Sequence, residues 1–123
     1  MIHLDTSFLI QALVLESPAE SKIQAWLKAG ENLGISTIAW SEFLCGPLNP
    51  QEETLAQTPL ATLEPFLEAD ARKAAVLFNA TGRRSRSLAD CQIAAVVMRC
   101  SVPLATGNVS DFTRLQSHGL DLV

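Results

Sequence analysis

Four acidic residues lie within apolar segments or close to their ends: Asp5, Glu42, Asp90 and Asp111. These positions make them candidates for one shared site. Carboxylates brought to about 4 Å repel by roughly 4 kcal/mol per pair at an effective dielectric constant of about 20. Such a cluster therefore requires a cation or protonation. Ligand sets made only of oxygen select Mg²⁺ or Mn²⁺, which polarise phosphates and activate water. We expect these acids to form a metal site that acts on phosphodiester bonds.

Each acid also has a purely structural interpretation. Asp5 and Asp111 fit the starts of helices, and the segment from Ser87 to Asp90 fits a capping box with Asp in place of Glu. Glu42 lies among apolar neighbours from Ile38 to Cys45, where a buried carboxylate is costly without a partner. A surface position for Glu42 is the alternative. Taken singly, the sequence does not separate capping from metal binding.

Strand and helix patterns alternate along the chain and would bring the acids together. The expected strands are residues 2–5, 33–36, 60–63, 102–105 and 120–123. The expected helices are 8–15, 18–29, 37–45, 51–57, 68–80, 87–100 and a short one from Asp111. This alternation predicts a single α/β domain over 1–123, with a largely parallel sheet of four to five strands and helices on both faces. Ligands bind at the carboxyl ends of such strands, which is where Asp5 and Asp111 are expected.

Composition excludes several classes of protein. The net charge of −4 does not fit a protein that coats nucleic acid with a broad basic face. The longest apolar run, Ile93 to Met98, is far too short to cross a membrane, and no signal peptide is recognised, so we expect a cytoplasmic protein. Three cysteines without C-x-x-C spacing predict reduced, mostly buried thiols rather than disulfides or a zinc site.

Two further groups have competing interpretations. Arg83, Arg84 and Arg86 directly precede the helix that carries Asp90, so they are candidates for binding substrate phosphates, with a solvated loop as the alternative. Ile23, Trp26 and Leu27 form an apolar stripe at helical spacing, for which core is favoured over an interface.

The order and spacing of four short motifs resemble those of the PIN-domain ribonucleases, and in particular the VapC-type toxins of bacterial toxin–antitoxin pairs. The motifs are Leu4-Asp5-Thr6-Ser7, Ser41-Glu42-Phe43, Ser87 to Ala95, and Thr106 to Phe112. The resemblance covers essentially the whole chain. It implies a PIN-like three-layer fold and metal-dependent endoribonuclease activity with Mg²⁺ or Mn²⁺. It also implies a cognate antitoxin as partner, and the apolar content of so short a chain fits a homodimer.

By this resemblance, Asp5, Glu42, Asp90 and Asp111 are expected to be metal ligands or their water-mediated supports. Thr106 and Asn108, with Thr6 and Ser7 of the first motif, are expected to support the site. Two departures are visible: Ser7 stands where Asn is frequent, and Gly107 stands where a basic residue is frequent. Asn108 is an acid in some relatives, and we favour Asp111 over Asn108 as the closer metal-site residue because it is charged.

Other classes fit less well. A phosphoacceptor receiver domain would carry a lysine near a late strand, but the only lysines are Lys22, Lys28 and Lys73. A phosphatase with an aspartyl nucleophile would have a second acid at residue 7, where Ser7 stands. The strongest alternative is a catalytically inactive PIN-like module that binds protein or RNA, and dependence on metal separates it from the enzyme.

Overall fold

A four-stranded parallel sheet forms the centre of the computed structural model, which describes residues 1–123. The strands are β1 (Ile2–Leu4), β2 (Leu33–Ser36), β3 (Leu60–Glu64) and β4 (Leu104–Ala105), in the order β3-β2-β1-β4. All pairs are parallel, so the carboxyl ends of the strands meet at one edge. Asp5 directly follows β1, and Asp111 comes after the neighbouring strand β4.

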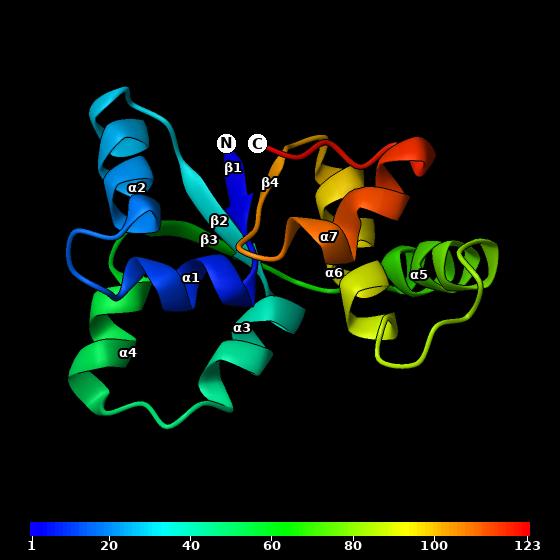
Figure 1. Ribbon diagram of the computed structural model, residues 1–123, viewed down its shortest axis with the longest axis horizontal. Coiled ribbons are helices and arrows are strands. Elements are labelled where there is room, and N and C mark those ends of the chain that lie inside the picture. The colour runs from blue at the N-terminus through cyan, green and yellow to red at the C-terminus, as the bar shows by residue number, and fades with distance from the viewer.

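Helices cover the sheet on both sides, as Figure 1 shows with α1, α2 and α4 on one side and α5, α6 and α7 on the other. Their bounds are α1 Thr6–Ala12, α2 Pro18–Lys28, α3 Thr37–Leu44, α4 Pro50–Gln57, α5 Glu68–Ala80, α6 Leu88–Cys100, α7 Val109–Phe112 and a 3₁₀ helix, η1, over Thr113–His118. The predicted α/β architecture, with a parallel sheet between two helical layers, is confirmed.

The carboxyl-terminal end differs from the sequence expectation. The predicted strand 120–123 is reduced to one isolated bridge between Leu104 and Leu122. The short helix begins at Val109 rather than Asp111 and continues as η1. Leu115 and Leu120 are buried on either side of the Gly119 turn, so the chain folds back onto the core instead of forming a fifth full strand.

Close packing within the sheet requires a glycine in β2. A Cβ atom at Gly34 would lie 2.8 Å from the Thr62 Cγ2 atom and 2.9 Å from the His3 ring. Such distances are shorter than van der Waals contact, so only glycine lets the His3 side chain lie across β2. This fixes how β1, the strand that precedes Asp5, sits against its neighbour.

The apolar stripe on α2 is divided between core and surface. Ile23 is buried and Trp26 stacks on Phe8 with ring centroids 5.7 Å apart, which supports the core interpretation for these two residues. Leu27 is 39% exposed, so the stripe does not belong wholly to the core.

The three cysteines differ in how far they are buried. All three cysteines are free thiols, but Cys45 is exposed and only Cys91 is fully buried, so the expectation of mostly buried thiols is wrong. Cys45 follows the last residue of α3, beyond the face that Phe43 packs into the core.

None of the helices has the length and apolar character that crossing a membrane demands.

A buried ion-pair network fixes the end of α6 that lies away from Asp90. Asp70 is buried, accepts a hydrogen bond from the Leu67 amide at 2.9 Å, and pairs with Arg99 Nε at 2.8 Å. Arg99 also contacts Glu64 at 3.1 Å and the Pro65 carbonyl oxygen at 3.1 Å. One arginine on α6 therefore ties this helix to α5 and to the end of β3.

We expect Arg99→Met to lower the free energy of unfolding by about 2–3 kcal/mol, because the buried Asp70 carboxylate would lose its charged partner. Arg72→Met removes an exposed pair with Glu68 on α5 and should cost less than about 0.5 kcal/mol. Urea denaturation of both variants measures the difference. Equal losses would show that the network does not hold the two helices together.

Candidate active site

Asp5 is both a helix cap and a member of the acidic site. It follows β1 and is buried, and its Oδ1 accepts hydrogen bonds from the Phe8 amide at 2.9 Å and from the Ser7 hydroxyl at 2.8 Å. The capping interpretation of Asp5 is therefore correct. Capping occupies Oδ1, while Oδ2 accepts a hydrogen bond from the Thr106 hydroxyl, so both carboxylate oxygens are held in fixed positions.

The loop after β4 supports Asp5 through a short chain of hydrogen bonds. The Thr106 hydroxyl donates to Asp5 and accepts from the Asn108 amide at 3.0 Å. The Ser7 hydroxyl donates to Asp5 and accepts from the Gly107 amide at 2.9 Å. The ends of β1 and β4 are thereby joined around one carboxylate, which fits the supporting roles expected for Ser7 and Thr106.

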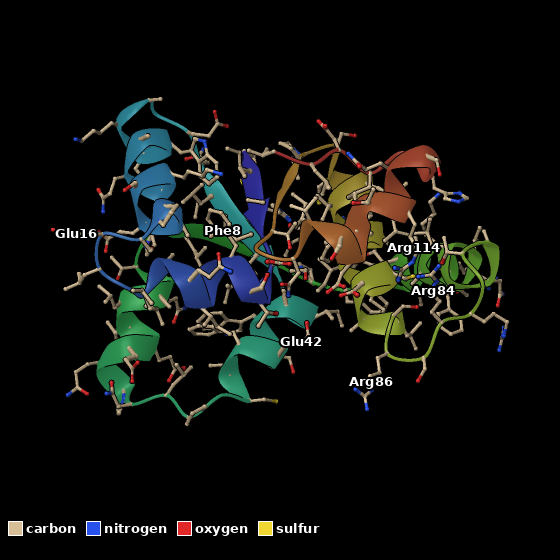
Figure 2. The ribbon with its side chains drawn as sticks, in the orientation of Figure 1. Phe8, Glu16, Glu42, Arg84, Arg86 and Arg114 are labelled. Carbon is tan, nitrogen blue, oxygen red and sulfur yellow. The ribbon has the colours of Figure 1, made fainter.

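Glu42 is exposed, so the expectation of a costly buried carboxylate is wrong for this residue. Helix α3 buries Ala39 and Phe43 and leaves Glu42 on its outer side, where Figure 2 shows it at the surface of α3. The Thr6 hydroxyl donates to the Ala39 carbonyl oxygen at 3.0 Å and lies 3.1 Å from Glu42 Oε1. Thr6 therefore ties α1 to α3 and orients the Glu42 carboxylate.

Asp90 and Asp111 lie in the first turns of α6 and α7 without capping them. The α6 N-cap, Ser87, makes no capping bond and instead donates its hydroxyl to the Arg84 carbonyl oxygen at 2.8 Å. The α7 N-cap is Asn108, again without a side-chain cap bond. The capping interpretation is therefore wrong for these two acids, whose carboxylates remain available.

The structure brings all four acids to one hollow of about 350 Å³ at the carboxyl edge of the sheet. Figure 2 shows side-chain oxygens gathered where the ends of α1, α3, α6 and α7 meet. The lining residues are Asp5, Thr6, Ser7, Ile10, Glu42, Arg86, Asp90, Ile93, Asn108, Asp111 and Phe112. Of the expected supporting residues, only Thr106 does not line the hollow, and it acts from behind Asp5.

Burial raises the pKa of both Asp5 and Asp90, and neighbouring carboxylates raise the pKa of Asp90 further. Burial raises the pKa of Asp5, against hydrogen bonds from Thr106, Phe8 and Ser7 that lower it. Burial, followed by the charges of Asp111 and Glu42, raises the pKa of Asp90 to about 6. The charge of Asp111 acts on Asp90, and both Asp111 and Asn108 line the hollow, so the preference for Asp111 as the closer metal-site residue stays a prediction.

The donor set fits a hydrated hard cation. The side-chain groups at the hollow that could bind a metal offer carboxylate, hydroxyl or amide oxygens. Burial first, and then the charges of Asp111 and Glu42, raise the pKa of Asp90, and a cation would offset the effect of these charges. No group of three or more His, Cys, Asp or Glu side chains is arranged to hold a metal ion directly. Mg²⁺ keeps several waters, so water-mediated contacts to these acids suit it better than a closed ligand cage.

The three arginines of the basic loop do not act as one group. Arg86 lines the hollow, with its backbone at φ +70, in the left-handed region. Arg83 hydrogen-bonds Asn79 and lies over the Phe78 ring, 5.3 Å from its centroid, so it is held against α5 instead. Arg84 does not line the hollow either. Among the expected substrate-binding arginines, only Arg86 lines the hollow, and its exposed side chain extends outward from the rim, as Figure 2 shows.

The two departures noted in the sequence have structural explanations. Ser7 replaces a larger amide but still bridges Asp5 and the Gly107 amide. A side chain at Gly107 would place its Cβ 2.4 Å from Gln11 Nε2, so the Gln11 side chain fills the space that a basic residue would enter. Polar support is thus retained, whereas no cation takes the place of the basic residue.

Sequence reasoning missed Arg114. This arginine is half-buried in η1, and its charge lowers the pKa of Asp90 against burial and the other acids. The available signal was a cation between the apolar residues Phe112 and Leu115, both of which are buried.

Comparisons with known proteins agree on the fold. VapBC2 from Rickettsia felis, bound to a DNA fragment from its promoter, superposes with a TM-score of 0.77 at 18% identity over 100% of this chain and 98% of that chain. A toxin–antitoxin complex from Klebsiella pneumoniae gives a TM-score of 0.72 at 23% identity, covering 91% of this chain and 90% of that chain. VapC20 of Mycobacterium tuberculosis, described as a sarcin-ricin loop cleaving toxin, gives a TM-score of 0.67 at 14% identity, covering 100% and 98%.

Sequence comparison identifies the family directly. No curated protein matches the chain. The family model described as PIN domain matches residues 2–116, which include all four acids, both β1 and β4, and the whole helical layer between them. The chain belongs to the PIN domain family.

Proposed function

We propose that this protein is a Mg²⁺- or Mn²⁺-dependent endoribonuclease and that it serves as the toxin of a toxin–antitoxin pair in the cytoplasm. The observation that carries the proposal is the hollow that collects Asp5, Glu42, Asp90 and Asp111 with one arginine, Arg86. Membership of the PIN domain family and the toxin–antitoxin complexes among its structural neighbours support the same function.

The chain's own residues would position RNA and the attacking water. Asp5, Glu42, Asp90 and Asp111 would hold the metal, which supplies a polarised phosphate and a more acidic water when bound. Thr106 and Ser7 keep the Asp5 carboxylate in one orientation, and Thr6 does the same for Glu42. Arg86, at the rim of the hollow, would bind the RNA backbone beside the acids.

A protein partner is supported by a separate surface. An apolar hollow of about 570 Å³ lies between α1, α2 and α4, and Leu15 and Leu55 on its lining are 81% and 62% exposed. Exposed apolar surface of this kind is typical of grooves that take an amphipathic segment of another protein. We propose the cognate antitoxin as that partner, because solved neighbours are complexes of this kind. The expected homodimer stays a prediction.

Cleavage of RNA tests the enzyme directly. We expect purified, antitoxin-free protein to cut a labelled total-RNA pool with Mg²⁺ or Mn²⁺ and not with EDTA. Asp5→Asn and Asp90→Asn should each lower the rate by about 100-fold or more, because each replaces a negatively charged carboxylate with a neutral amide, which is a weaker metal ligand. Asp121→Asn, at an exposed acid away from the hollow, is the matched control and should cut normally.

The opposite result favours the alternative function. Folded wild-type protein that neither cuts RNA nor binds Mn²⁺ by calorimetry would indicate a catalytically inactive PIN-like module that binds protein or RNA.

Stability without metal should report the repulsion among the acids. Because burial and the neighbouring carboxylates raise the folded-state pKa of Asp90 to about 6, its ionised form opposes folding. Between about pH 4 and 6 the Asp90 carboxyl binds more protons in the folded protein than in the unfolded chain, so the contribution of Asp90 to stability rises as the pH falls through this window. Asp90→Asn removes the ionised carboxylate and should therefore be the more stable protein above pH 6 in EDTA.

Urea denaturation from pH 4 to pH 7.5 measures this gap, which should be largest above pH 6 and nearly closed at pH 4. Asp121→Asn again provides the comparison. If the difference in free energy of unfolding between Asp90→Asn and wild type instead grew as the pH fell, ionised Asp90 would not be the group that destabilises the folded protein.

The basic loop gives a paired test of substrate binding. In EDTA, where no cutting is expected, Arg86→Gln should weaken binding of a short single-stranded RNA by about fivefold or more and lower the salt dependence of binding. Arg83→Gln makes the same change in charge at a residue held by Asn79 and Phe78 and should have a smaller effect. Fluorescence anisotropy across a KCl series measures both, and equal effects would argue for a diffuse basic loop.

A further inference from the structure

Arg114 is an arginine without a partner inside the fold. Its Nε atom is buried and makes no hydrogen bond, one of two such side-chain atoms in the protein. None of the four ion pairs includes it. A buried donor without a partner costs about 1–3 kcal/mol, and no ion pair inside the fold compensates the Arg114 guanidinium.

The backbone around Arg114 is firmly held. The residue lies in η1, which directly follows the α7 turn that carries Asp111. Phe112 and Leu115, on either side of it, are buried in the core. Figure 2 shows Arg114 drawn against the body of the molecule, in contrast to Arg86, which extends outward. The guanidinium is therefore positioned by the fold and not by a flexible loop.

The charge of Arg114 acts on the acidic site without being neutralised there. It lowers the pKa of Asp90, after the larger and opposite effects of burial, Asp111 and Glu42. It also lowers the pKa of Cys91, the next residue of α6, where burial has the larger and opposite effect. Yet no carboxylate oxygen lies within 4.0 Å of its nitrogens, since no ion pair forms. Arg114 is thus near the start of α6 with its hydrogen-bonding capacity unused.

A phosphate group is a suitable partner for the Arg114 guanidinium. Guanidinium groups bind phosphate through two parallel N–H to oxygen bonds, a geometry that a single carboxylate at a distance does not offer. The terminal nitrogens of Arg114 are not among the buried unpartnered atoms, so they reach solvent while Nε stays inside. An anion approaching from solvent is therefore able to meet them.

We propose that Arg114 binds a phosphate of the RNA backbone beside the acidic hollow. Arg114 does not line the hollow itself, so its phosphate would be a neighbour of the one held at the acids and Arg86. Two cations at different points would fix the course of the strand past the carboxylates. This inference rests on the proposed nuclease function and adds a residue that positions its substrate.

Equilibrium binding in EDTA tests this proposal apart from catalysis. The probe is a fluorescent single-stranded RNA of mixed sequence, followed by anisotropy across a KCl series. Arg114→Gln should bind about tenfold more weakly and lower the slope of log K against log salt by about 0.7, the loss expected for one phosphate contact on a single strand. Arg114→Lys should keep the slope and recover part of the affinity, because it restores the charge without the planar fork.

Arg72→Gln is the matched control, since it removes one positive charge from an exposed residue of α5 that does not line the hollow. Arg114→Met keeps much of the apolar stem and replaces Arg114→Gln if that variant does not fold. Thermal denaturation of each variant establishes that it is folded.

Three results would overturn the proposal, and each has a different meaning. If wild type binds RNA while folded Arg114→Gln or Arg114→Met matches Arg72→Gln in affinity and slope, this inference fails and the nuclease function stands. If wild type neither binds nor cuts RNA, both fail together. A loss of Mn²⁺ affinity without a change in RNA binding would show that Arg114 acts on Asp90 instead, which also overturns phosphate binding.

Discussion

Repulsion among four carboxylates at one edge of a parallel sheet is the constraint on which the candidate site depends. Asp5 bears the greatest burial and receives the most hydrogen bonds, from Thr106, Ser7 and the Phe8 amide. Glu42 and Asp111 are exposed; the Glu42 carboxylate accepts a hydrogen bond from Thr6. The site thus combines one buried, fixed acid with two exposed acids that face solvent, from which a hydrated cation would enter.

The scaffold opposes this repulsion by fixing α6 at its far end. Asp90 lies in the first turn of α6, and Arg99 lies in its last turn within the buried network of Asp70 and Glu64. The thirteen residues of α6 span about 20 Å, so the ion-pair network stabilises the helix without adding charge to the hollow. Stability is therefore supplied at one end of the helix, and electrostatic strain is concentrated at the other, where chemistry is proposed.

Sequence patterns predicted the fold well because its helices and strands are short, regular and bounded by residues that favour turns or helix ends. Pro18 and Asn49 start helices as their types suggest, and the apolar strands β1 and β2 are buried on both faces. The exposure of Glu42 was not predictable, since which face of an apolar helix meets the core depends on Phe43 and Ala39 packing against distant elements. Arg83 and Arg86 are three residues apart, and the local contacts of Arg83 with Phe78 and Asn79 at the end of α5 distinguish it from Arg86. Arg114 gave no motif at all, because its significance lies in the partners it does not have.

The absence of a preformed metal cage bears on how substrate and metal would combine. Because no three acids hold an ion directly, a hydrated cation alone gains less from this hollow than from a closed cage. A phosphate oxygen would supply a further anionic ligand, while Arg86 lowers the repulsion that the phosphate meets. Binding of the ion and of the RNA backbone should then reinforce each other, since each relieves a charge imbalance that the other leaves. Under the proposed function, an acidic protein with a net charge of −4 would thereby bind RNA at one place and repel it elsewhere.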